Sequence, residues 1–139
     1  MFYVSFFCRS SKVHFYKIGL DGKTSTSSKK WKLYTFSDIR ALLGHVNTQI
    51  DVVKMDIESA EWASLRQMID SGEILKFKQL LVEYHIWNED LSKMKLFQDL
   101  EKAGYRKFYV HKNIHCPRNV KGFPGKRTIC YEIHYVRRP

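Results

Sequence analysis

Short apolar runs alternate with stretches of helical periodicity along the chain, and this alternation predicts strands separated by helices. Residues 50–57 and 80–86 are nearly continuous apolar runs, which are typical of strands covered on both faces. Residues 13–18 predict an earlier strand, and residues 105–111 and 129–136 predict two later ones.

Helices are expected in the three intervals between the first four of these strands. Thr35 and Asp38 match a capping box for the first helix, and Ser59 suits the N-cap of the second. Trp62 lies on the apolar face of the second helix and is expected in the core. The third helix is expected to end at Gly104.

Strands that alternate with helices imply right-handed crossovers and a largely parallel sheet. The interval between the last two strands holds prolines and glycines and predicts a long loop, so these strands should pair as an antiparallel hairpin at one edge. The 139 residues, of which 44% are hydrophobic, suffice for one modest core. The prediction is a single α/β domain over residues 1–139, with a mainly parallel sheet and a C-terminal antiparallel β-hairpin.

The charge is strongly basic, with 24 Lys and Arg against 14 Asp and Glu. Such an excess suits nucleic acid, an anionic substrate or an acidic membrane surface. No RNA-binding signature or zinc-finger spacing accompanies it, so no specific nucleic-acid partner is expected. The longest apolar run, residues 2–8, is too short to cross a bilayer, and no membrane segment is expected.

Acidic side chains and one histidine follow two neighbouring predicted strands. The first strand ends in Asp56 and Glu58, with Glu61 just beyond, and the next ends in Glu83 and His85. Ligands bind beyond the carboxyl ends of strands in open α/β sheets, so these five residues predict a site. The alternative is that Glu58 or Glu61 stabilises the start of the following helix.

The cysteine count of three argues against a disulfide framework. Cys116 and Cys130 could pair in an oxidising compartment, but their spacing alone leaves this open. Together with His111, His115 and His134 they match no standard zinc spacing, so no metal site is predicted.

Several segments resemble one family when they are taken in order. Residues 53–62 (VKMDIESAEW) resemble the K-x-D-I-E-G-A-E-W signature of the FkbM-like methyltransferases and the related animal methyltransferase-like proteins. Residues 80–85 (LLVEYH), 103–106 (AGYR) and 130–133 (CYEI) are similar to later motifs of that family. With the strand and Gly-Leu at residues 15–20, the resemblance covers roughly residues 13–136.

The resemblance implies the second half of a Rossmann-like fold that uses S-adenosylmethionine, with the five predicted strands as the third to the seventh of that fold. It implies that Gly19 and Leu20 lie near the adenine, that Asp56 lies near the reactive methyl group or the acceptor, and that Glu83 and His85 lie on the acceptor side. Asp56, Glu83 and His85 are the expected catalytic residues, with His85 as base for transfer to a hydroxyl of a small-molecule or glycan-like acceptor, since imidazole ordinarily titrates nearest neutrality. Glu58 and Glu61 are expected to bind that acceptor.

Two departures from the family pattern shape the functional expectation. Ser59 replaces a family glycine, and an N-cap role for this position would make serine a good substitute. Residues 1–12 form an atypical N-terminus without a glycine or an acid, whereas donor binding calls for a glycine-rich turn and an acid for the ribose. The donor site is therefore expected to be incomplete, as in a fragment.

Three functions follow from this comparison. The first is an S-adenosylmethionine-dependent methyltransferase domain that transfers a methyl group to oxygen. The second is a catalytically inactive fragment that acts as a binding or interaction module, with an open sheet edge suited to homodimer formation. The third, less favoured, is a basic nucleic-acid-binding domain.

Overall fold

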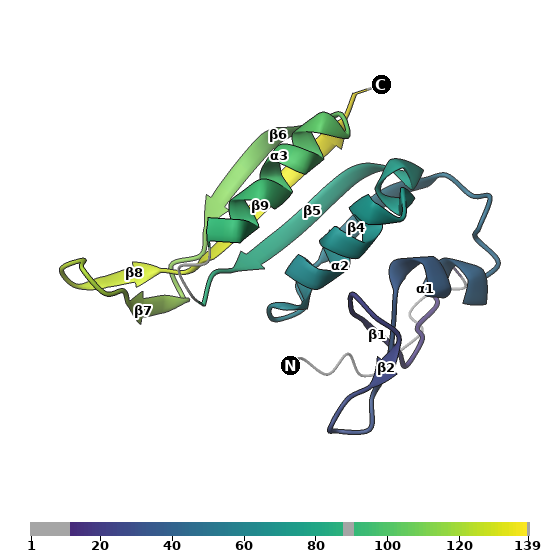
Figure 1. Ribbon diagram of the computed structural model, residues 1–139, viewed down its shortest axis with the longest axis horizontal. Helices are drawn as coiled ribbons and strands as arrows, with labels where there is room; N and C mark the ends of the chain where they lie inside the picture. The colour runs from purple at the N-terminus through teal and green to yellow at the C-terminus, as the bar shows by residue number, and fades with distance from the viewer. Residues whose placement is uncertain (1–11, 88–90, 139) are drawn as a thin grey trace.

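The computed structural model describes residues 12–87 and 91–138, so most of the atypical N-terminus lies outside the described residues (Figure 1). The central sheet has four strands in the order β4-β5-β9-β6. They are β4 (Ile50–Met55), β5 (Phe77–His85), β9 (Cys130–Arg137) and β6 (Tyr105–Lys112). Two small sheets flank it: β1 (Gly19–Leu20), β3 (Lys32–Tyr34) and β2 (Ser25–Thr26) form one, and β7 (Pro117–Asn119) and β8 (Lys126–Thr128) form the other.

The α/β class is confirmed, but the expectation of a mainly parallel sheet is wrong. In the central sheet β4 and β5 run parallel, whereas β9 runs antiparallel to both β5 and β6. The last two strands do pair antiparallel as predicted. The pair stands at one edge of the sheet, also as predicted, with β6 outermost, and its inner strand β9 adds a second antiparallel pairing with β5.

Two helices cover one face of the central sheet. Figure 1 shows α2 (Ala60–Asp70) and α3 (Met94–Lys102) on the same side of the strands, and α2 packs against both β5 and α3. The remaining helical segments are α1 (Phe36–Leu42), η1 (Glu73–Lys76) and η2 (Leu91–Lys93). The buried core lies between the helices and the sheet, and includes Leu65, Met68, Leu80, Val82, Tyr84 and Leu100.

The opposite face of β4 is open, contrary to the expectation of a strand covered on both sides. Val52 is 48% exposed and Lys54 is exposed, while the alternate residues Val53 and Met55 are buried under the helices. A run of apolar residues therefore predicted the strand correctly but overstated its burial, since Lys54 interrupts the run on the open face.

Two other local predictions are wrong: the strand expected at residues 13–18, and the long loop expected between the last two strands. Residues 13–18 are irregular, and Val13 and Tyr16 are about half exposed, because β1 pairs with β3 only at Gly19–Leu20. β-propensity needs a neighbouring strand to take effect. The predicted long loop instead contains β7 and β8, whose three-residue sequences, Pro-Arg-Asn and Lys-Arg-Thr, carry no apolar alternation.

Candidate active site

The turn that joins β4 to α2 brings the acidic residues to the carboxyl end of the parallel pair. Glu58 and Ser59 both have left-handed backbone conformations, with φ angles of 53° and 81°. Ser59 occupies the position before α2, but its side chain makes no capping hydrogen bond. Ser59 is therefore the N-cap residue by position, as predicted, but serine is not the good substitute expected there, because the position has a positive φ, which glycine adopts at lower cost.

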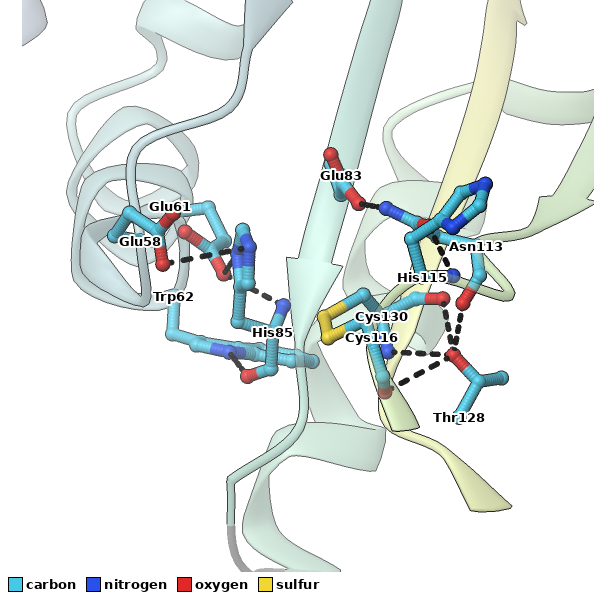
Figure 2. Close-up of a disulfide and its surroundings, with 10 residues drawn as sticks. All are labelled: Glu58, Glu61, Trp62, Glu83, His85, Asn113, His115, Cys116, Thr128 and Cys130. Atoms are coloured by element: carbon cyan, nitrogen blue, oxygen red, sulfur yellow. Dashed lines mark hydrogen bonds and ion pairs between the residues drawn. A yellow bond between two sulfur atoms is a disulfide. The ribbon is translucent and has the colours of Figure 1, made fainter. Parts of the chain in front are cut away.

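Glu61 lies in the first turn of α2 and points into the protein. Its side chain is completely buried, and its Oε1 accepts a hydrogen bond from the backbone N–H of His85 at 2.8 Å. The Nδ1 atom of His85 lies 3.0 Å from the same oxygen (Figure 2). Because a carboxylate oxygen only accepts, Nδ1 is the donor in this contact, and in the neutral imidazole Nε2 is then the acceptor.

His85 is held on several further sides. Its side chain is buried, and its Nε2 lies 3.7 Å from Glu58 Oε2. The Trp62 indole N–H donates to the His85 carbonyl at 2.9 Å, and the Trp62 ring packs on Tyr84 in the core, as expected for this residue. The Trp87 ring lies nearly parallel to the imidazole, with the ring centroids 5.7 Å apart. These contacts fix the direction of the free Nε2 atom.

Asp56 and Glu83 lie beside each other at the same rim. Partial desolvation at the rim is the largest influence on the Asp56 pKa, and together with the neighbouring Glu83 carboxylate it raises this pKa. Glu83 in turn accepts a hydrogen bond from the Asn113 side-chain amide at 2.7 Å. Asp56 thus holds a proton more readily than an exposed aspartate does.

The donor atoms of Asp56, Glu58 and His85 lie within 4.8 Å of one another, within reach of a single divalent cation. The sequence predicted that these three residues share a site, but not that they could hold a metal ion. The cluster that it did consider is arranged differently, because Cys116 and Cys130 form a disulfide with a Cα–Cα distance of 5.8 Å and are not free to bind zinc. Figure 2 shows this disulfide across the end of β5 from Glu58 and Glu61.

The residues expected at the adenine have other neighbours. A Cβ atom on Gly19 would lie 2.5 Å from the Leu33 side chain, so Leu33 fills the space beside Gly19. Leu20 packs against the core. Asp56, by contrast, is exposed at the rim, where a carboxylate suits a positively charged sulfonium. The fit to a methyl donor therefore depends on Asp56 among these three residues.

Sequence reasoning brought together Asp56, Glu58, Glu83 and His85, and the structure places all four at one rim. It missed the contribution of Asn113 and Trp87, and it left open the pairing of Cys116 with Cys130 that the structure shows. Asn113 precedes Cys116 in the predicted loop, and no periodic signal singles it out.

None of the helices in the described part of the chain is both long and apolar enough to span a membrane. The chain is similar to two curated proteins, both called probable methyltransferase-like protein 24. It is 32% identical to the Homo sapiens protein and 31% identical to the Rattus norvegicus protein, over 100 residues in each case. The match covers 63% of this chain but 27% of the human protein and 28% of the rat protein, so the chain spans about a quarter of their length.

No solved structure matches the chain. The family model described as a methyltransferase domain matches residues 2–124, which is most of the sequence. This agrees with the ordered motifs from residue 53 onwards and with the acidic rim at the ends of β4 and β5. The chain belongs to the methyltransferase domain family.

Proposed function

We propose that the chain acts in S-adenosylmethionine-dependent methyl transfer to a hydroxyl oxygen, with His85 as the general base. The contact between Glu61 and the Nδ1 atom of His85 carries this proposal, because it leaves Nε2 as a proton acceptor at the ends of the parallel strands. We propose a hydroxyl acceptor because an alcohol must lose its proton as it is methylated, and the positioned imidazole can receive that proton.

The reaction balances around three groups. Bound S-adenosylmethionine would supply the methyl group and be released as S-adenosylhomocysteine. His85 Nε2 takes the proton from the acceptor hydroxyl as the new C–O bond forms. Glu61 then lies against the charged imidazolium and stabilises it, so Glu61 is a positioning residue in this proposal and not a contact for the acceptor.

The remaining acids have separate roles. Asp56 would lie against the sulfonium, where a carboxylate offsets its positive charge. Glu58, with a side chain that is 34% exposed beside Nε2, is placed to accept a hydrogen bond from the acceptor. Glu83, held by its hydrogen bond from Asn113, raises the pKa of Asp56, so the charge on the β5 side of the rim affects the carboxyl on the β4 side.

The acceptor that we propose is a small molecule or a glycan-like hydroxyl compound, which follows from the resemblance to FkbM-like enzymes. The family match supports methyl transfer in general, and the strand-end geometry supports the base.

The test is transfer of a labelled methyl group to a panel of hydroxyl acceptors by the wild-type chain and two variants. His85→Asn should reduce turnover by about 100-fold or more, the usual contribution of a positioned base. The control is Lys78→Gln, on an exposed residue at the opposite end of β5 from His85, and this variant should turn over normally. Undiminished turnover in His85→Asn, with folding intact by circular dichroism, would remove His85 from this role.

A second candidate is an interaction module that dimerises without catalysis. The observation that favours it is the position of β4, which pairs with β5 on one side and has no described strand on the other. Such an edge is suited to pairing with a second copy. A concentration-independent monomer in sedimentation velocity would contradict this candidate.

A further inference from the structure

A pocket of about 940 Å³ lies between the β7–β8 hairpin and the residues that follow β5. Its lining includes four basic side chains and three aromatic ones: Lys112, Arg118, Lys121, Arg127, Trp87, Phe123 and Tyr131. None of the described lining residues carries a carboxylate. The volume is in the range of sites that hold a small molecule or a short glycan segment.

Arg118 and Arg127 are directly opposite each other in this hairpin. They are partners in the antiparallel register of β7 and β8, so their side chains leave the same face of the two-stranded sheet. Like charges in directly opposed positions destabilise a strand pair. An anion bound between the two guanidinium groups would remove this repulsion and make charge-assisted hydrogen bonds with both.

Each of these arginines is also held against an aromatic ring. The Arg118 guanidinium lies 5.3 Å from the Trp87 ring centroid, and that of Arg127 lies 5.8 Å from the Phe123 centroid. Such contacts restrict the guanidinium groups before a ligand arrives, which lowers the entropy cost of binding. The hairpin is fixed at its base by the Cys116–Cys130 disulfide.

Trp87 connects this pocket with the candidate active site. Its ring lies against the imidazole of His85 and also lines the pocket. A molecule that places an anionic group between Arg118 and Arg127 therefore lies one aromatic ring away from the proposed base. This arrangement suits an acceptor with its charge at one end and its hydroxyl at the other.

We propose that this pocket binds the anionic group of the acceptor, a phosphate, a sulfate or a carboxylate. The assignment of the ligand as acceptor depends on the proposed methyl transfer, whereas the assignment of an anion site does not. A small anionic metabolite or an acidic sugar unit fits the volume, and the basic excess of the chain then has a specific use.

The experiment is an NMR titration that follows the indole N–H signals of the three tryptophans, with Trp87 assigned from a Trp87→Phe variant. The probes are inorganic sulfate, inorganic phosphate and glucuronate, each added at constant ionic strength in the absence of a methyl donor. Arg118→Gln/Arg127→Gln is compared with Lys32→Gln/Arg138→Gln, which removes the same charge at exposed positions outside the pocket.

Saturable movement of the Trp87 signal by at least one probe is expected, with the dissociation constant raised about tenfold or more in Arg118→Gln/Arg127→Gln alone. The probe that binds best identifies the anionic group. Equal weakening of probe binding in both double variants, or no saturation with any probe, would overturn the site. A short single-stranded RNA that binds more tightly than these probes, and that both double variants weaken equally, would overturn it too. Because no donor is present, failure to bind an anion leaves the methyl-transfer proposal standing. Anion binding by a chain that shows no methyl transfer would leave the anion site standing and contradict the methyl-transfer proposal.

Discussion

Glu61 and His85 are 24 residues apart in sequence, yet one carboxylate oxygen of Glu61 contacts both the backbone N–H and the ring Nδ1 of His85. The first residues of α2 are thereby joined to the last residue of β5. The other oxygen of Glu61, Oε2, is buried and has no hydrogen-bond partner among the described residues. This asymmetry allows the charge of Glu61 to be separated from its hydrogen bonds by substitution.

Glu61→Gln should keep the fold and change the chemistry. The amide oxygen can replace Oε1, so we expect the free energy of unfolding to change by no more than about 1 kcal/mol. The acidic limb of the pH–rate profile should move to lower pH, because the imidazolium loses the carboxylate that stabilises it. Glu61→Ala, measured by urea unfolding, should lose about 2–3 kcal/mol since two buried donors lose their partner. An unchanged pH–rate profile in Glu61→Gln would leave Glu61 with a purely structural role.

Ser59→Gly should stabilise the chain, by about 1 kcal/mol, because the residue has a φ of 81° and its side chain makes no capping bond. The matched control is Ser71→Gly, at the other end of α2, where φ is −85° and glycine should cost about 0.5–1 kcal/mol. Thermal unfolding of both variants checks the pair. A loss of stability in Ser59→Gly would contradict the left-handed geometry.

Asp56→Asn should stabilise the chain in a pH-dependent way. The folded-state pKa of Asp56 is raised, so the native state binds more protons than the unfolded state between the ordinary and the raised value. Wild-type stability therefore decreases as pH rises through that window, and asparagine removes this loss. The melting temperature of Asp56→Asn should exceed that of wild type at neutral pH and converge with it below the ordinary aspartate pKa. A constant difference at every pH would contradict the coupling to Glu83.

The disulfide between Cys116 and Cys130, 14 residues apart, should stabilise the segment that carries the proposed anion pocket. Cys116→Ser/Cys130→Ser should lower the free energy of unfolding by about 3 kcal/mol, the usual value for a loop of this length. Reductant should lower the wild-type value similarly and leave the variant unchanged. If reductant has no effect on wild type, the cysteines are not paired in solution.

The sequence predicted the rim because the rule for parallel strands needs only two adjacent strand ends, and Asp56, Glu83 and His85 stand at them. It did not predict the depth of Glu61, since a helix N-terminus offers an acid both an exposed and a buried position. Serine was expected to suit position 59 because serine is a good N-cap residue, and a single sequence gives no signal that this position has a left-handed backbone conformation. The opposition of Arg118 and Arg127 depends on the register of two three-residue strands, which carries no apolar pattern.

The position of β9 in the sheet could not be predicted from local sequence pattern either. Local pattern fixes that residues 130–137 form a strand, but the choice between the edge and the space beside β5 is made by long-range packing. Arg40 is a further example: it is 2% exposed and donates to the carbonyls of His45, Val46 and Thr48, partners supplied by a loop without periodicity.

The most direct test of the central claim is calorimetric titration of the 139-residue chain with S-adenosylhomocysteine. We expect saturable binding of one ligand per chain, and weaker binding by Asp56→Ala than by the control Asp51→Ala, an exposed residue at the start of β4. A folded chain that releases no heat of binding would contradict the claim that this domain takes part in methyl transfer as it stands.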